Sequence, residues 1–318
     1  MQRNKVIAAV RQWFSEQDFL EVDCPALQVS PGNEAHIHAF QTSLIDTAGV
    51  ASTRYLHTSP EFSCKKLLAA GETRIFNLGH VFRNREGTLT HTPEFTMLEW
   101  YRVSEDYTII IEDSLNLVKL ATQTVSGNAW IWKDRVCDPY APAEWLTVQN
   151  AFLTYAGVDL LATGNDRDVL AEISPVDFQH GESWSDIFSR ILVEKIEPQL
   201  GNGRLTILHE YPTSEAALAR TCAHDDRVAE RFELYACGVE LANGFGELTD
   251  AEEQRRRFLA EMDIKELRYG ERYPIDEDLL DALAMMPPAS GVALGLDRVI
   301  MLATGATAIE QVQWVPVR

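Results

Sequence analysis

The sequence predicts an α+β protein in which helices flank an antiparallel β-sheet. One observation is a hairpin pattern, in which 231–235 and 239–241 read as two strand arms around Cys237-Gly238. Another is that hairpin-like strands are mixed with separated helices rather than alternating with them. A doubly wound parallel sheet would need regular β-α alternation and a glycine fingerprint at its first turn, and the sequence has neither.

The N-terminal elements follow from apolar spacing and capping residues. A helix is predicted at 5–17, and its apolar stripe reads as core or dimer packing: Val6, Ile7, Val10, Trp13 and Phe14. A short strand is expected at 19–22, closed by Pro25. Ser59-Pro60-Glu61 has the form of a helix start, with serine as cap, and Gly71 would end that helix.

Further along, 74–83 and 94–103 read as strands joined by a long polar connection, and long ordered loops are often functional. From 107 to 200 we expect mostly helix, including an amphipathic helix at 185–200. A strand at 205–209 and a charged helix at 250–270 follow. A glycine-rich segment at 291–295 then enters a helix-like run.

Composition narrows the class of protein. The 318 residues carry a formal net charge of −20, which repels nucleic acid at long range, and no basic block offsets it. The basic run at 255–257 lies among glutamates and reads as a solvated helix face. Five scattered cysteines without a C-x-x-C pair argue against a zinc site or a disulfide framework, and no long apolar run or signal peptide appears. We therefore expect a soluble, cytoplasmic protein.

Two segments fit together as one active site: FRNREGTLTHTPEFTMLEWYR at 82–102 and GVALGLDRVIML at 291–302. Each holds an arginine, Arg83 or Arg298, where a loop meets a regular element. A guanidinium is permanently charged, and its rigid donor fork suits phosphate. With carboxylates between them in sequence, the two arginines predict a nucleoside triphosphate site that does not use a P-loop.

The carboxylates recur every seven residues in ERFELYACGVELANGFGELTD, as Glu233, Glu240 and Glu247. Glycines break a helix here, so a hairpin is the better interpretation. A two-residue turn at Cys237-Gly238 makes Glu233 face Ala242 and puts Glu240 diagonally beside it, roughly 7–8 Å away between backbones. A turn at 236–237 would place the two acids directly opposite, and a three-residue turn would put them on opposite faces.

Two acids on one buried face repel each other unless a cation joins them. Magnesium, which takes oxygen ligands and shares them with phosphates, is the expected ion. The alternative is that both carboxylates face solvent. The direction of Glu247 stays open, and a free glutamate near the site would suit an amino group on a substrate.

The motifs resemble those of the class II aminoacyl-tRNA synthetases. Motif 1 of that class is resembled by VIAAVRQWFSEQDFLEVDCPAL, and motif 3 is resembled by GVALGLDR. Motif 2 is resembled by PEFTMLEWYR together with the arginine that precedes it. VELANGFGELTD resembles the lysine subgroup. The resemblance covers nearly the whole chain and implies that class's catalytic core, with a dimer interface around Pro25.

Lysyl-tRNA synthetases carry an anticodon-binding domain before motif 1, whereas here motif 1 begins within the first ten residues. We therefore expect one catalytic domain over 1–318 without an anticodon-binding domain. Such a shortened core is similar to the elongation factor P β-lysine ligase family, which activates (R)-β-lysine with ATP and transfers it to a lysine of elongation factor P. This resemblance implies that protein as acceptor, lysine or β-lysine as substrate, and no tRNA or membrane partner.

The resemblance also implies roles by motif position. Arg83 would hold the α-phosphate and Arg298 the γ-phosphate, while Glu233 and Glu240 would hold Mg²⁺. Glu240 and Leu241 would lie near the nucleotide, and Gly295 would allow ATP to approach closely. The amino-acid pocket would comprise Ser59, Pro60, Glu61, Tyr101, Glu247 and Ala293. Ala293 stands where lysyl enzymes have glycine, and its methyl group would reshape the pocket for a β-amino acid.

Two positions depart from the motif 2 pattern. Arg85 stands where a glutamate near adenine is usual, so either Glu86 takes over or Arg85 alters the nucleotide contacts. Thr92 replaces an asparagine expected to contact the nucleotide. His91 lies in the same loop, where it would touch ATP or order the loop. The His36-x-His38 pair has no third ligand nearby in sequence, so metal binding there is not favoured.

Two competing functions remain. One is a lysine-activating enzyme that charges tRNA or another acceptor, which the missing anticodon-binding domain disfavours. The other is a catalytically silent paralogue that acts as a binding module, which would be expected to lack the motif arginines or the acidic pair. The sequence keeps both the motif arginines and the acidic pair.

Overall fold

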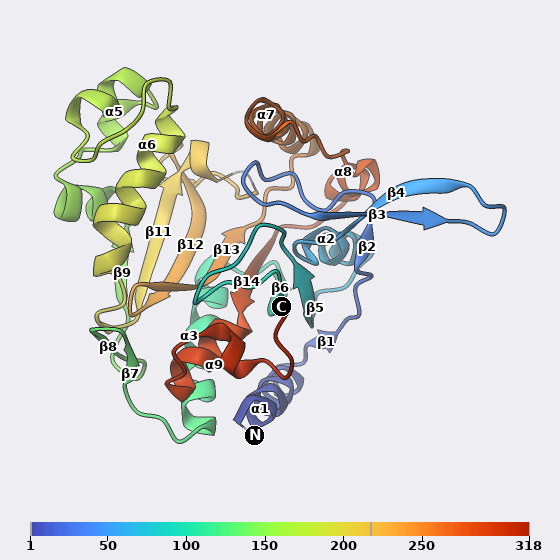
Figure 1. Cartoon of the computed structure of the whole chain (residues 1–318), viewed down its shortest axis with the longest axis horizontal. Coiled ribbons are helices and arrows are strands. Elements are labelled where there is room, and N and C mark those ends of the chain that lie inside the picture. Colours follow the sequence, from blue (N-terminus) through green and yellow to red (C-terminus); the bar gives the residue numbers. More distant parts are fainter. Residues whose placement is uncertain (1, 217, 318) are drawn as a thin grey trace.

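The computed structural model describes residues 2–216 and 218–317 and is organised around one large, strongly twisted sheet (Figure 1). Its strand order is β1-β5-β6-β14-β13-β12-β11-β9, and the neighbours from β5 to β11 are antiparallel. The two edge strands, β1 and β9, pair in parallel. The predicted antiparallel sheet flanked by helices is therefore correct for its centre. The strands are β1 (Leu20–Glu21), β5 (Arg74–Phe82), β6 (Glu94–Val103), β14 (Ala289–Gly295), β13 (Val239–Gly246), β12 (Val228–Ala236), β11 (Thr206–Pro212) and β9 (Glu144–Thr147).

One face of the sheet is covered by three helices, which form the main hydrophobic core with it. Side chains alternate along a strand, so Leu98 and Trp100 of β6 enter this core while Glu99 and Tyr101 point to the other face. The same alternation sends Val292 and Leu294 of β14 into the core. The other face of β6 and β14 is thereby left for a site. The covering helices are α1 (Gln2–Glu16), α3 (Tyr107–Thr124) and α9 (Leu296–Thr304).

The second face is bordered by helices from two parts of the chain. Helices α2, α7 and α8 form one hydrophobic cluster, which includes Tyr101 of β6. Helices α4, α5 and α6 form a second hydrophobic cluster against β11 and β12. In Figure 1, α5 and α6 lie to the upper left of the central strands, and α7 and α8 lie to the upper right. Their bounds are α2 (Glu61–Ala69), α7 (Ala251–Tyr269), α8 (Glu277–Leu283), α4 (Val148–Ala151), α5 (Arg167–Ile173) and α6 (Trp184–Ile191).

Two predicted helices, α2 and α7, begin and end within one residue of their predicted bounds. The Asp250 side chain accepts hydrogen bonds from the first turn of α7, and Gly270 ends that helix at φ +66°, so the predicted 250–270 helix is confirmed. Helix α2 begins one residue later than predicted. Pro60 is its N-cap, and the Ser59 hydroxyl accepts from Glu61 N at 3.0 Å.

The prediction of a mostly helical 107–200 segment is wrong in part. It contains β9 and a small hairpin of β7 (Trp130–Trp132) and β8 (Arg135–Asp138), which pairs with β10 (Gly203–Arg204). Strands of three or four residues are too short for period-2 alternation to identify. The predicted 185–200 helix starts at the Ser183 capping box as α6, then changes to a π-helix (Leu192–Ile196) and a 3₁₀ turn (Glu197–Gln199).

A third, small sheet projects from the body and was not predicted. It consists of β2 (Leu27–Gln28), β4 (Ala51–Leu56) and β3 (Phe40–Ile45), with the β3–β4 arm extending outward (Figure 1). Among the described residues, no helix is both long enough and apolar enough to cross a membrane.

Candidate active site

A cavity of about 310 Å³ opens on the face of the sheet that the main core leaves free. Strands β6, β12, β13 and β14 form its floor, and the loop between β5 and β6 forms a wall. Most of the predicted site residues meet in its lining, although they come from distant parts of the chain. These are Ser59, Glu61, Arg83, Glu86, His91, Thr92, Glu233, Glu240, Leu241, Ala293, Gly295 and Arg298.

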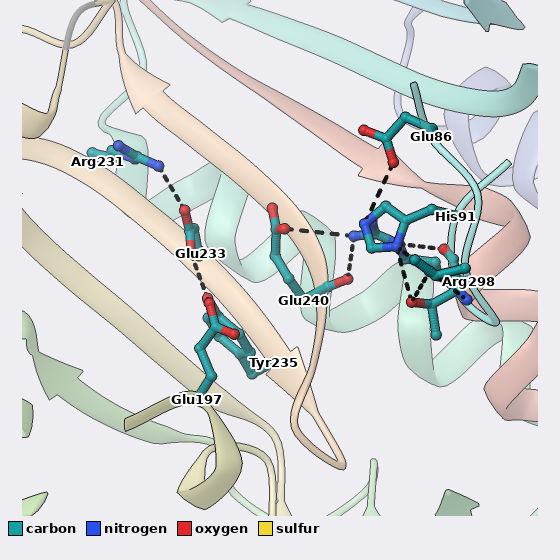
Figure 2. A network of polar contacts seen from close by, with 10 residues as sticks. Glu86, His91, Glu197, Arg231, Glu233, Tyr235, Glu240 and Arg298 are labelled. Atoms are coloured by element: carbon teal, nitrogen blue, oxygen red, sulfur yellow. Dashed lines mark hydrogen bonds and ion pairs between the residues drawn. The ribbon is translucent and has the colours of Figure 1, made fainter. Parts of the chain in front are cut away.

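Arg298, in the first turn of α9, makes contacts at one end of the cavity (Figure 2). Its Nη1 donates to the Glu240 carbonyl at 2.9 Å, and its Nη2 lies 2.6 Å from His91 Nε2. Its Nε donates to the Thr90 carbonyl at 3.2 Å. The guanidinium is therefore held at the cavity wall by the loop between β5 and β6 and by the β12–β13 hairpin.

His91 is kept neutral by its surroundings. Withdrawal from water, followed by the charges of Arg298 and Arg83, lowers the pKa of His91 to about 4. A neutral imidazole can accept at Nε2 from Arg298 while Nδ1 donates to the hydroxyl of Thr88 at 2.8 Å or of Thr90 at 3.1 Å. Through these contacts the histidine orders the loop and orients Arg298.

Arg83 follows β5 directly and also lines the cavity. Its Nε donates to the Thr58 carbonyl at 3.2 Å, and its guanidinium lies 5.4 Å from the centre of the Phe95 ring. Within the described residues Arg83 has no acidic partner within 4.0 Å. An arginine whose charge is not neutralised by the protein is available for an anionic ligand.

Arg85 and Glu86 point in different directions. Arg85 has a left-handed backbone at φ +64°, pairs with Glu271 and does not line the cavity. Glu86 does line it, with Oε2 3.8 Å from His91 Nε2. Of the two possibilities that the sequence left open, the geometry favours Glu86 at the nucleotide. The predicted contact of Arg85 with a nucleotide would require the Glu271 pair to open.

The β12–β13 hairpin places Glu233 and Glu240 on one face, as predicted. The turn is at Cys237-Gly238, both with positive φ (53° and 71°), as in a two-residue type I′ turn. Glu240 is paired with Tyr235, but a bulge then shifts the register, so Glu233 faces Asn243 rather than Ala242. The predicted partner is wrong by one residue because a bulge adds a residue to one strand, which turn geometry alone does not reveal.

The two carboxylates have unequal surroundings. Glu233 is buried and accepts from Arg231 Nη2 and from the Tyr235 hydroxyl, both at 2.6 Å (Figure 2). Burial and the charge of Glu233 raise the pKa of Glu240. A third acid, Glu197, lies beside Tyr235, and burial together with the charges of Glu233 and Glu240 raises its pKa to about 7. Sequence analysis did not single out Glu197, because it comes from the insertion after α6.

This acidic cluster fits magnesium in one respect only. Glu233 and Glu240 offer oxygen ligands on one face, and their mutual repulsion would fall if a divalent cation lay between them. In 2–216 and 218–317, however, no three histidine, cysteine, aspartate or glutamate side chains are arranged as a complete metal site. The ion would therefore have to share oxygen ligands with a bound phosphate.

The other end of the cavity is formed by α2 and β6. The Ser59 hydroxyl donates to Glu99 Oε2 at 2.8 Å, and the Tyr101 hydroxyl donates to the other oxygen of Glu99. Burial, followed by the charge of Glu61, raises the pKa of Glu99 to about 8. Tyr101 thus lies beneath the pocket as a support for Glu99, a residue that sequence analysis did not identify. Alternation along β6 from Tyr101 could have indicated it.

The sequence left the direction of Glu247 open, and the structure shows that its carboxylate is not free. Glu247 is buried, and its Oε2 lies 2.7 Å from the ammonium of Lys65, which also contacts Glu61 at 2.6 Å. Burial raises the pKa of Glu247 to about 7 even though Lys65 opposes that shift. Lys65 is itself buried, so it neutralises two carboxylates from inside the fold. Pro60 lies at the start of α2 and does not line the cavity.

Ala293 and Gly295 lie in β14 on the cavity face. Ala293 is the cross-strand partner of both Glu99 on β6 and Asn243 on β13. Its methyl group therefore lies in the floor of the cavity, between the positions of Glu99 and Asn243. His36 and His38 are engaged elsewhere, His36 with the Tyr269 hydroxyl and His38 with Glu271, both at 2.9 Å.

The antiparallel sheet carries one arginine before β6, another after β14, and paired carboxylates on a hairpin. Together these features define a catalytic core of the class II aminoacyl-tRNA synthetase type. The chain belongs to the family described as tRNA synthetases class II (D, K and N), which matches residues 1–318.

Curated relatives match over nearly the whole chain. It is 39% identical over 320 residues to the elongation factor P–(R)-β-lysine ligase of Haemophilus ducreyi, covering 98% of this chain and 91% of the relative. It is 38% identical over 317 residues to the ligase of that name from Erwinia tasmaniensis (98% and 93% covered). It is 37% identical over 322 residues to that from Yersinia enterocolitica (100% and 94% covered).

Proposed function

We propose that the protein activates (R)-β-lysine with ATP and transfers it to a lysine side chain of elongation factor P, as an AMP-forming ligase. One observation carries this proposal. A single cavity joins an arginine end, with Arg83 and Arg298, to a second end lined by Ser59 and Glu61, beneath which Glu99 is buried. Such a cavity suits a triphosphate at one end and a diamino acid at the other. The names of the relatives supply the acceptor.

In the first step, the substrate carboxylate forms a bond to the α-phosphorus, and the bond from that phosphorus to the bridging oxygen breaks. Pyrophosphate leaves with the electron pair. Arg83 would stabilise charge on the α-phosphate and Arg298 on the γ-phosphate, so that positioning and electrostatics supply the catalysis. Glu233 and Glu240 would hold Mg²⁺, which supplies charge neutralisation to the phosphates when bound.

In the second step, the acceptor amine attacks the carbonyl of the adenylate, AMP leaves with the electron pair, and the amine loses a proton. The acidic end would bind the amino groups of the activated substrate and hold its carbonyl in place. Glu99 supports this end from beneath, because the hydroxyls of Ser59 and Tyr101 hold both its oxygens. Glu61 lines the same end and is oriented by Lys65.

Ala293 supports β-lysine over α-lysine. Its methyl group lies between the positions of Glu99 and Asn243, where glycine would leave more room. A β-amino acid carries its amino group one carbon further from the carboxylate, so the pocket must hold that group at a different place. Ala293→Gly should therefore shift preference toward α-lysine.

The wider assignment follows the same reasoning. We propose residues 1–318 as one catalytic domain that works as a homodimer in the cytoplasm. Leu20 and Leu27 are exposed, at 51% and 47%, on either side of Pro25, which supports a dimer contact there. The net charge of −20 disfavours tRNA as acceptor. A lysine-activating enzyme for another acceptor is the second candidate, because the acidic end would also bind α-lysine.

The test is ATP–pyrophosphate exchange with α-lysine and (R)-β-lysine side by side, followed by labelling of elongation factor P. We expect preference for (R)-β-lysine, loss of exchange in Arg298→Ala, and transfer to one lysine of the acceptor. Equal or greater exchange with α-lysine would contradict the assigned substrate. Exchange without transfer would favour the second candidate, and no exchange with either amino acid would favour a non-catalytic binding protein.

A further inference from the structure

An open groove adjoins the arginine end of the cavity, on the side away from the amino-acid end. It has a volume of about 460 Å³ and shares Thr90, His91, Glu240 and Arg298 with the cavity. Its outer wall is the small β7–β8 hairpin, which contributes Lys133 and Arg135. We propose that this groove, here called the β7–β8 groove, is the exit and re-entry site for magnesium-bound pyrophosphate. This inference rests on the proposed adenylate-forming activity.

Arg135 is unusual among the arginines of this chain because its guanidinium has no acidic partner among the described residues. Among the arginines that the structure describes, Arg54, Arg83 and Arg135 have no acidic group within 4.0 Å, whereas the others form ion pairs such as Arg204–Glu144. In a chain with 48 acidic and 28 basic residues, an arginine without a partner is conspicuous. Lys133 also has no ion-pair partner in the described part of the chain, although Asp134 follows it directly in sequence.

Lys133 and Arg135 both line the groove. Lys133 is the first residue of the two-residue turn between β7 and β8, and its φ of +55° fixes that turn. Arg135 reaches the β12–β13 turn. Its Nη1 lies 2.7 Å from the place where a Cβ on Gly238 would stand, so the guanidinium rests against that glycine. Gly238 is two residues before Glu240, so Arg135 comes close to the proposed metal-holding strand.

The opposite wall is acidic, which selects the form of the ligand. Glu197 and Glu240 line the groove and would repel a free polyanion. The same two carboxylates would attract a divalent cation carried by the polyanion. Pyrophosphate with bound Mg²⁺ has both a polyanion for the basic wall and a divalent cation for the acidic wall, so it matches the charges on each side. A single nucleotide base or an apolar ligand would satisfy neither.

Position in the reaction explains why such a groove is needed. Bond cleavage at the α-phosphorus releases pyrophosphate next to Arg298, while the adenylate must stay bound for the second step. The amino-acid end of the cavity is occupied by the activated substrate at that moment. An exit beyond His91 and Arg298 lets pyrophosphate leave without passing the adenylate, and the reverse reaction would use the same path.

The experiment is ATP–pyrophosphate exchange with pyrophosphate as the varied reactant, for Lys133→Ala, Arg135→Ala and the double variant. Exposed single ion contacts are worth less than about 1 kcal/mol, so each substitution should raise KM for pyrophosphate by about two- to five-fold. The double variant should raise it by about ten-fold, with KM for the amino acid unchanged. Arg135→Lys should recover most of the loss, since it keeps the charge.

Arg204→Ala is the matched control, because Arg204 is an exposed arginine on β10, the strand paired with β8, and does not line the groove. It should leave KM for pyrophosphate unchanged. An unchanged value in the double variant would overturn the proposal, as would an equal rise in KM for the amino acid or in the control. A native enzyme that shows no exchange at all would instead contradict the adenylate-forming activity itself.

Discussion

Arg298 Nη2 and His91 Nε2 lie 2.6 Å apart, although 207 positions separate the two residues in the sequence. The contact joins the first turn of α9 to the loop between β5 and β6. Because the pKa of His91 is lowered to about 4, the imidazole is a neutral acceptor near pH 7. Arg298 is thus held by neutral groups and one weakly contacted carboxylate, Glu240 at 3.5 Å, which a phosphate can replace.

Arg298→Lys should lower kcat/KM for ATP in the exchange reaction by about 100- to 1000-fold. The reason is that a lysine keeps the charge but cannot direct three nitrogens toward His91, Glu240 and Thr90 while meeting a phosphate. His91→Gln, which keeps a neutral acceptor, should cost less than ten-fold. Steady-state exchange kinetics with ATP varied would measure both, and similar losses in the two variants would contradict the separate roles.

The second prediction concerns Glu99 and pH. Its pKa of about 8 in the folded protein exceeds the ordinary glutamate value of 4.5, so the folded state keeps a proton that the unfolded chain loses. The free energy of unfolding should therefore fall as pH rises from about 4.5 to 8, by a few kcal/mol at most from this group. In Glu99→Gln this dependence should be shallower. Urea denaturation at pH 5 and pH 8 gives the comparison, and parallel pH profiles would rule out a raised pKa.

Glu99 also illustrates the limits of sequence analysis. The motifs located the arginines and the β12–β13 carboxylates, because strand alternation and turn residues are local signals. The interaction of Lys65 with Glu247 is not local in sequence. Nothing in either segment predicts that a buried ammonium would form an ion pair with that carboxylate. Glu197 is similar, since it reaches the acidic pair from a π-helical and 3₁₀ segment that periodicity reads as plain helix.

The third prediction concerns this Lys65 bridge. Lys65→Met removes the ammonium and leaves Glu61 and Glu247 without their cation, which for buried groups typically costs about 3–5 kcal/mol. Adding Glu247→Gln should restore part of that loss, because the second buried charge is then removed. A double-mutant cycle on the free energy of unfolding measures the coupling. Additive losses in the cycle would mean that Lys65 and Glu247 stabilise the fold independently.

The last prediction separates two glycines of β14 that look alike in the sequence. A Cβ on Gly291 would lie 2.2 Å from Tyr101 Cε1 and 2.5 Å from Glu247 Oε1. Both distances are shorter than non-bonded contacts of a Cβ atom in proteins. A Cβ on Gly295 would meet Arg298 Cδ at 3.6 Å and the Leu241 carbonyl at 3.8 Å, which are ordinary contacts. Gly291→Ala should therefore lower the melting temperature by several degrees, since overpacking typically costs about 1–3 kcal/mol.

Gly295→Ala, by contrast, should leave the melting temperature within about a degree of the original, because the protein offers room for the methyl group. If ATP approaches the backbone there, the same methyl group should raise KM for ATP without changing KM for the amino acid. Because the methyl group would meet only the ligand, the kinetic effect would report nucleotide position rather than folding. Unchanged KM for ATP in a stable Gly295→Ala protein would place the nucleotide elsewhere in the cavity, and would leave Gly295 with a purely conformational role at the start of α9.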